Sequence, residues 1–202
     1  MTEEEVRIML VKRAIEKKNY KFFTNGIYNL NIVGIRSLNR RADVFDDWLC
    51  CIYKDESQRF VCKQWKITTD AGTYWMRNPM NQKGTAMLVP KQYSNSWKIG
   101  MHKGKYPALV QCAPVAVYRD SNKDKIEDLD PSTIEIGDFG INIHRSNPVC
   151  EIAEIGKYSA GCQVFANPLD FSEFMNLVQK SSTAFGNLFT YTLLHSTDFD
   201  EL

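Results

Sequence analysis

The sequence predicts a mostly β fold of the α+β class, with one helix at the N-terminus and one helix late in the chain. Three observations support this prediction. The first eighteen residues carry apolar side chains at helical spacing. After Asn25-Gly26, a turn signal, the pattern changes to short runs rich in Val, Ile, Tyr, Phe and Trp. Loops that contain Gly, Pro, Asn and Asp separate these runs.

The N-terminal helix has both a start signal and an apolar stripe. Thr2 and Glu5 match a capping box, in which each side chain bonds the backbone N–H of the other residue. The stripe consists of Val6, Met9, Leu10 and Ile15. This narrow stripe fits a helix that packs on the β domain and equally a helix that binds a partner.

Five segments are predicted as strands, and one later segment as a helix. The strand segments are 28–35, 59–68, 107–119 with a break at Pro114, 139–144 and 188–194. The late helix is expected near 169–180, with Asp170 or Ser172 as its N-cap. We therefore divide the chain into an N-terminal helix with a lead-in segment, residues 1–50, and a mostly β domain, residues 51–202.

Composition restricts the function classes. The chain has 202 residues, and 25 Lys and Arg against 24 Asp and Glu give a net charge of +1. This balance argues against nucleic acid as a partner. No apolar run approaches the ~20 residues of a membrane-spanning helix. The N-terminus is charged from its third residue, so we expect synthesis in the cytoplasm without a signal peptide. The irregular spacing of the six cysteines matches no disulfide or zinc pattern, so we expect reduced thiols. We also expect the protein to be a monomer.

One segment, 143–165, places a histidine and a cysteine where they can cooperate. His144 ends a predicted strand, and Cys162 follows Gly161 and leads into another predicted apolar strand. A thiol must lose its proton to act as a nucleophile, and a nearby imidazole can accept that proton. The backbone N–H groups of a glycine turn can hold an oxyanion. The alternative is a buried structural cysteine and a structural histidine.

The same segment resembles the YkuD-type L,D-transpeptidase family, whose motif is a histidine, a spacer and Ser/Thr-His-Gly-Cys. Here fourteen residues separate His144 from Ser159-Ala160-Gly161-Cys162. Ile143-His144 and Ile155-Gly156 also match flanking positions, and the resemblance covers roughly residues 60–170. The stretches WKIGMHKGKYPALVQ and FGINIHRSNP resemble divergent YkuD-like proteins encoded by phages of Bacteroidetes.

The resemblance implies a YkuD-like β-sandwich or barrel that acts on peptidoglycan stem peptides of the bacterial cell wall. Cys162 would be the nucleophile, forming a thioester, and His144 the base, oriented by a backbone carbonyl. Ser159 and Tyr93 lie in segments similar to the family's and would contact substrate. Ala160 stands where the family has histidine, and Val164 where it has Arg or Asn.

These departures favour hydrolysis, as in an endolysin-type L,D-peptidase of a phage, over transpeptidation that forms 3-3 cross-links. A third possibility is a non-catalytic peptidoglycan-binding or virion component. A papain-like protease fits less well, because its cysteine precedes its histidine.

Two further segments carry candidate residues. His102 lies among glycines and lysines and is a second imidazole that could approach the cleft, while Arg145 and the lysines Lys98, Lys103 and Lys105 could meet substrate carboxylates. Either set could equally be solvated surface.

We expect no cofactor and no catalytic metal. Asp120, Asn122 and Asp124 alternate as in calcium loops, but Lys125 and Pro131 stand where an EF-hand needs Gly and Glu. A looser calcium loop and a solvated turn are the two readings of this segment.

Overall fold

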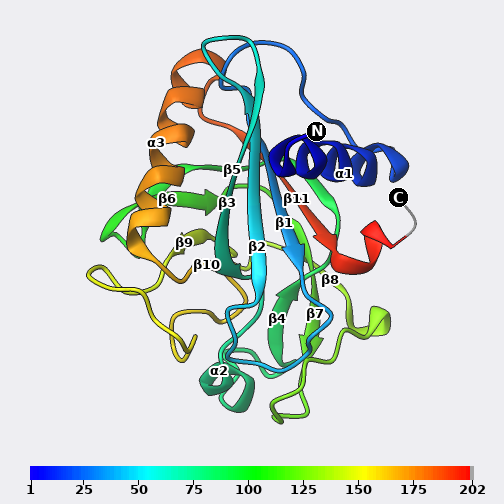
Figure 1. The fold of residues 1–202 in the computed structure, drawn as a ribbon. Helices are drawn as coiled ribbons and strands as arrows, with labels where there is room; N and C mark the ends of the chain where they lie inside the picture. The colour runs from blue at the N-terminus through cyan, green and yellow to red at the C-terminus, as the bar shows by residue number, and fades with distance from the viewer. Residues whose placement is uncertain (201–202) are drawn as a thin grey trace.

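The computed structural model describes residues 1–200, which form a closed eight-stranded barrel, a separate three-stranded sheet and three α-helices (Figure 1). The predicted mostly β class, with an N-terminal and a late helix, is confirmed. Around the barrel the strands are β1 (Asn31–Arg36), β11 (Phe189–His195), β5 (Gln92–His102), β6 (Tyr106–Gln111), β9 (Ile143–Arg145), β10 (Gln163–Phe165), β3 (Phe60–Thr68) and β2 (Asp47–Lys54).

The small sheet and the short helical turns lie outside the barrel. The sheet is β4 (Thr85–Leu88), β7 (Val115–Asp120) and β8 (Glu135–Gly137), and the turns are α2 (Thr73–Arg77), η1 (Pro131–Thr133) and η2 (Ser196–Phe199). Pro114 separates β6 from β7, as predicted, because proline cannot donate to a strand ladder. At this break the chain leaves the barrel for the small sheet.

Strand β2 explains how one layer of strands serves two cores. Leu49 and Cys51 pack into the main core inside the barrel, whereas Cys50 and Ile52 pack in a second core outside it. This alternation follows from the period of two in a strand. Each fully buried apolar side chain contributes roughly 1.5–3 kcal/mol.

Helix α1 (Glu3–Lys17) covers the second core. The capping box of Thr2 and Glu5 is confirmed, since each accepts the other's backbone N–H. The buried face is formed by Val11, Ala14 and Ile15. The other stripe positions, Val6, Met9 and Leu10, are only half-buried. Figure 1 shows α1 and α3 on opposite sides of the barrel.

Helix α3 (Pro168–Phe185) begins earlier than predicted. Its N-cap is Asn167, whose side chain accepts the N–H of Leu169 at 2.8 Å. The expected caps, Asp170 and Ser172, lie inside the helix, because Pro168 is already suited to the first helical position. The apolar face of α3 packs into the main core through Phe171, Phe174, Leu177 and Val178.

The predicted strand segments match β1, β3, β6 with β7, and β11, while most of 139–144 is irregular and only its end enters β9. Strand β10 directly follows Cys162, where the sequence predicts an apolar strand. Strands β2, β4, β5 and β8 were not predicted. The boundary at residues 50/51 falls inside β2, and β1 already belongs to the barrel. Among the helices of residues 1–200, none has the length and apolarity needed to cross a bilayer.

Candidate active site

Strands β9 and β10 bring the candidate nucleophile and base to one face of the barrel. They run parallel, with His144 opposite Val164. Cys162 is two residues before Val164, so its side chain emerges on the same face as that of His144. The N–H of Gln163 donates to the carbonyl of Asn142 at 2.9 Å. This hydrogen bond holds the backbone next to Cys162 against the residue that precedes β9.

The thiol of Cys162 is half-buried and held by backbone groups. Its sulfur accepts the N–H of Asn142 at 3.4 Å and lies 3.5 Å from the carbonyl oxygen of Gly140. Burial raises the pKa of the thiol, and the Asn142 N–H and the charge of Lys103 offset this only in part. The resting sulfur is therefore protonated near neutral pH.

His144 is buried, and one of its ring nitrogens is fixed by its neighbours. Nδ1 lies 2.7 Å from the carbonyl oxygen of Arg145, and a carbonyl can only accept, so Nδ1 carries the proton. The Tyr106 hydroxyl, which donates to the same carbonyl at 3.1 Å, lies 3.3 Å from Nδ1. This tautomer leaves Nε2 as a lone-pair acceptor.

The Nε2 atom of His144 is buried and has no hydrogen-bond partner within residues 1–200. Burial, together with the adjacent His102, lowers the pKa of His144 to about 3. A neutral imidazole thus shares a face with a neutral thiol. No hydrogen bond joins the two side chains in the described part of the chain, so the resting state is not a thiolate–imidazolium pair.

The structure brings His102 against His144. The two rings stack with centroids 3.9 Å apart and planes 24° apart. His102 Nδ1 accepts the side-chain amide of Asn142 at 3.1 Å. Burial, and then Lys103 and Arg145, lower the pKa of His102 to about 4. Two neutral rings can stack without charge repulsion, whereas two imidazolium rings could not.

Ser159 and Gly161 build the turn before the cysteine. Ser159 is fully buried, with Oγ 2.6 Å from the carbonyl of Asp70 and 2.9 Å from that of Cys162, and it accepts the Gly161 N–H at 3.1 Å. Gly161 has φ +116°, and a Cβ there would lie 2.0 Å from the Ala86 oxygen. Ser159 therefore contacts the protein's own backbone, and the Gly161 N–H is already engaged.

The other predicted substrate residues lie at different places. Arg145 stacks on Tyr106, with its guanidinium carbon 4.1 Å from the ring centroid, beside His144. Tyr93 is in the main core, where its hydroxyl donates to the Val89 carbonyl at 2.7 Å. Asp120, at the end of β7, begins the loop that contains the other two calcium candidates, Asn122 and Asp124.

A groove of about 240 Å³ adjoins the cysteine turn. Its walls include Ala160, Phe139, Trp75 and Arg119. Ala160 is two residues from Cys162, and Phe139 precedes the glycine whose carbonyl faces the thiol. Arg119 lies over the Phe139 ring, with its guanidinium carbon 4.8 Å from the centroid. The groove therefore combines aromatic walls with a cation.

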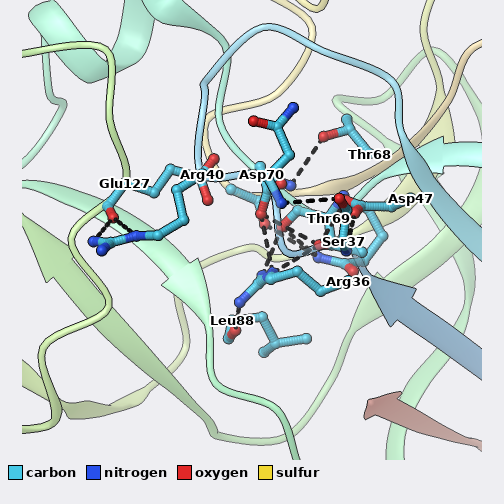
Figure 2. Close-up of polar contacts among 12 residues, drawn as sticks. Arg36, Ser37, Arg40, Asp47, Thr68, Thr69, Asp70, Leu88 and Glu127 are labelled. Atoms are coloured by element: carbon cyan, nitrogen blue, oxygen red, sulfur yellow. Dashed lines mark hydrogen bonds and ion pairs between the residues drawn. The ribbon is translucent and has the colours of Figure 1, made fainter. Parts of the chain in front are cut away.

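Behind the turn lies a buried polar network centred on Arg36 (Figure 2). Arg36 is ion-paired with Asp70 at 3.0 Å and donates to the carbonyls of Leu88 and Thr69. Asp47 accepts the N–H groups of Ser37 and Thr69. The network reaches the turn through two backbone carbonyls, since that of Asp70 faces Ser159 Oγ and that of Thr69 faces the amide of Gln163.

Asp46, Asp47 and Asp70 place carboxylate oxygens within 4.8 Å of one another. The guanidinium of Arg36 is already paired with Asp70, and backbone N–H groups bind both oxygens of Asp47. A metal ion would have to displace these donors. We therefore interpret the three carboxylates as part of the network that positions the turn.

Sequence reasoning missed several residues around the thiol and the imidazole. Tyr106, Asn142 and Gly140 contact them through a hydroxyl or backbone groups, and Arg119 reaches the groove from the small sheet. No motif marks these positions, because backbone donors carry no residue-type signal. Comparison of the chain with family models, curated proteins and solved structures finds no match.

Proposed function

We propose that this protein is a cysteine-dependent acyl-transfer enzyme that acts on peptidoglycan stem peptides, with Cys162 as nucleophile and His144 as general base. The observation that carries the proposal is the buried Nε2 of His144, which is held as an unpartnered acceptor on the face that bears Cys162. A structural histidine buried in a β-barrel would be expected to pair both nitrogens.

The protonation states define the first step. The thiol and the imidazole begin neutral, so His144 Nε2 takes the Cys162 proton as the sulfur attacks the peptide carbonyl. The Asn142 N–H already points at the sulfur and stabilises negative charge that develops there. Because Ser159 engages the Gly161 N–H, the N–H of Cys162 is the donor that we assign to the oxyanion.

The second step returns the proton. Collapse of the tetrahedral intermediate expels the amine, which takes the proton from His144, and leaves a thioester on Cys162. His144, neutral again, then removes a proton from water, which hydrolyses the thioester to a carboxylic acid and the free thiol. An amine of another stem peptide in place of water would give a cross-link. The resemblance to the L,D-transpeptidases supports peptidoglycan stem peptides as the substrate class. Ala160 and Val164, which replace polar residues of that family, favour water over an amine as the acyl acceptor.

Charge around the site supports an acidic peptide as substrate. Lys103 and Arg145 lie close enough to lower the pKa of His102. Arg119 in the groove pairs with Glu135 at 2.8 Å, and Lys83 pairs with the same carboxylate, which leaves one net positive charge among the three. Stem-peptide carboxylates would be drawn to these cations.

The test is mass spectrometry of muropeptides and intact sacculi incubated with the protein. We expect loss of terminal D-Ala or opened cross-links, and a fall in rate of at least about 10³-fold in Cys162→Ala. Cys112→Ala, which removes an exposed cysteine, is the matched control and should keep full activity.

New 3-3 cross-links that depend on Cys162 would make the enzyme a transpeptidase. Unchanged muropeptides together with co-sedimentation on sacculi would contradict the enzymatic proposal and favour a peptidoglycan-binding or virion component. Localisation at the cell wall, as for a phage lysin made in the cytoplasm, belongs to the same proposal.

A further inference from the structure

Two of the six cysteines, Cys50 and Cys62, lie together in the second core, away from the proposed active site. On the paired strands β2 and β3, Cys50 is opposite Gln64, and Ile52 is opposite Cys62. The two cysteines are therefore diagonal neighbours whose side chains leave the same face of the sheet. A side-chain hydrogen bond joins the two thiol groups, and both are free thiols.

Helix α1 places a cation and a carboxylate against Cys62. The Arg7 side chain forms a hydrogen bond with the Cys62 sulfur, and the Glu4 carboxylate accepts the Cys62 N–H at 2.7 Å. Arg7 is half-buried, and no ion pair within residues 1–200 includes it. Its charge is therefore available to the thiol and is not neutralised by a paired carboxylate.

These contacts give the two thiols different roles. The hydrogen bond from the Cys50 thiol, together with the charge of Arg7, lowers the pKa of Cys62 despite its burial. The same hydrogen bond, together with burial, raises the pKa of Cys50. Burial also raises the pKa of Cys51, the next residue on β2. Cys62 is thus the thiol of this group that forms a thiolate, which is the form that oxidants attack.

A cavity of about 280 Å³ between α1 and the barrel reaches the pair. Its walls include Arg7, Cys50 and Gln64, and most of the remaining lining is apolar. Cys62 is 7% exposed, whereas Cys50 is fully buried. A small oxidant therefore meets the Cys62 sulfur first, and Cys50 is held behind it as the second thiol.

We propose that Cys62 and Cys50 form a peroxide-sensitive pair, which a hydroperoxide converts into a reversible disulfide. The Cys62 thiolate attacks one oxygen of the hydroperoxide and the O–O bond breaks, which leaves a sulfenic acid on Cys62. The other oxygen takes up a proton and departs as an alcohol, or as water when the oxidant is hydrogen peroxide. The Cys50 sulfur then attacks the sulfenic sulfur, and the hydroxyl departs with the Cys50 proton as water.

The disulfide would strain the sheet beneath α1. Diagonal neighbours have Cα atoms roughly 7–8 Å apart, whereas disulfides usually span ~4.4–6.8 Å. The new bond would therefore draw β2 and β3 together, and a thiol reductant would reverse it, because strained disulfides are easily reduced. Arg7 and Glu4 contact Cys62, so α1 is the element that the change affects first. The proposal does not depend on peptidoglycan chemistry.

The experiment treats the reduced full chain with equimolar H₂O₂, blocks the remaining thiols in denaturant and maps them by peptide mass spectrometry. We expect two of the six thiols to be lost, a cross-linked peptide that joins Cys50 to Cys62, and recovery of both thiols with dithiothreitol. Cys51→Ala is the matched control, because Cys51 is the adjacent cysteine on β2 but packs in the main core. It should form the same cross-link.

Three variants separate the steps. Cys50→Ala should stop the reaction at a sulfenic acid on Cys62, which dimedone traps, and Cys62→Ala should leave Cys50 reduced. Arg7→Gln leaves both cysteines in place and should slow the oxidation of Cys62 by roughly 3–10-fold, because it removes the cation that favours the thiolate.

Three results would overturn the proposal. One is that Cys50 and Cys62 stay reduced while other cysteines are oxidised. Another is that no cross-link joins them in the parent or in Cys51→Ala. The third is that Cys62 of Arg7→Gln is oxidised at the rate of the parent. Because the measurement counts thiols and follows no turnover, none of these results bears on the proposed peptidoglycan activity.

Discussion

At the scale of single residues, burial sets the chemistry of the proposed site. His144 and Cys162 share a face of the barrel, and burial opposes the charged form of each. The Arg145 carbonyl selects the His144 tautomer, because only a protonated Nδ1 can donate to it. His102 stacks on the His144 ring and also stays neutral, because burial lowers its pKa. The site therefore depends on a proton transfer that accompanies nucleophilic attack.

The neutral state of His144 predicts a pH dependence of stability. Its folded pKa of about 3 is below the ~6.5 of an unfolded histidine, so between these values the unfolded chain binds more protons. Stability should therefore fall as the pH falls from ~6.5 toward ~4. We expect His144→Asn, which keeps a donor for the Arg145 carbonyl, to reduce this slope by up to about 1.4 kcal/mol per pH unit.

Urea denaturation at a series of pH values from 4.5 to 7 would measure that slope. Tyr106→Phe is the control, because it changes a contact of the same imidazole without removing a group that titrates in this range. A slope that stays the same in His144→Asn would show that His144 binds as many protons in the folded chain as in the unfolded chain, and would contradict a histidine that burial keeps neutral.

At the scale of elements, the turn 159–162 links the barrel to the small sheet. Ser159 Oγ meets three backbone groups, and Ala160 bridges to Ala71. Gly161 brings the chain against the Ala86 carbonyl of β4 with a backbone angle that favours glycine. The position of Cys162 thus depends on backbone contacts, and we expect it to be sensitive to a single added methyl group.

Gly161→Ala tests this dependence. The added Cβ would lie 2.0 Å from a backbone oxygen, which cannot move as a flexible side chain can, so we expect a loss of roughly 2–4 kcal/mol of stability and of most activity. Gly156→Ala is the matched control, since Gly156 also has a positive φ, +54°, but a Cβ there meets nothing within 4 Å. It should cost about 1–2 kcal/mol. Thermal unfolding and the muropeptide assay would compare them, and equal effects would contradict the steric argument.

At the scale of the whole molecule, the network around Arg36 joins segments far apart in sequence. Asp47, Asp70 and Glu127 are buried around one arginine. Burial, together with the nearby Asp70, raises the pKa of Glu127 to about 10, so Glu127 is protonated at neutral pH. The carboxyl–carboxylate contact between Glu127 and Asp70 therefore attaches the 120–128 loop to the barrel beneath the cysteine turn.

Glu127→Gln should stabilise the protein in alkaline solution. The folded pKa of Glu127 exceeds the ~4.3 of an unfolded glutamate, so its stabilising contribution is complete at low pH and is lost as the pH rises toward about 10. Glutamine keeps a donor and never ionises. At pH 9 we expect the variant to gain ~1 kcal/mol of stability, which raises the Tm of a chain of this size by about 2–4 °C above that of the parent. At pH 5 we expect little difference in Tm.

The control is Glu135→Gln, which removes a carboxylate that pairs with Arg119 and Lys83 and should lower the Tm at pH 9. Differential scanning calorimetry at both pH values would compare the variants. If Glu127→Gln were less stable than the parent at pH 9, the Glu127 carboxyl would have to be ionised in the folded state, with its charge neutralised by a cation such as Arg36.

The sequence by itself determined the features that local patterns encode. The capping box at Thr2, the proline break before β7 and the late helix are set by neighbouring residues, so they can be read along the chain. The close spacing of His144 and Cys162 also identified a candidate pair without any fold. The strands that carry this pair, β9 and β10, have three residues each and are too short to show the two-residue alternation of a strand.

The tertiary structure alone decided how these parts meet. Closure of the barrel put β9 beside β10, stacked His102 on His144, and moved Ser159 and Tyr93 from predicted substrate contacts into buried hydrogen bonds. It also buried the carboxylate network, whose members lie tens of residues apart. Burial and long-range contact change protonation and exposure, and neither property belongs to a residue until the chain has packed around it.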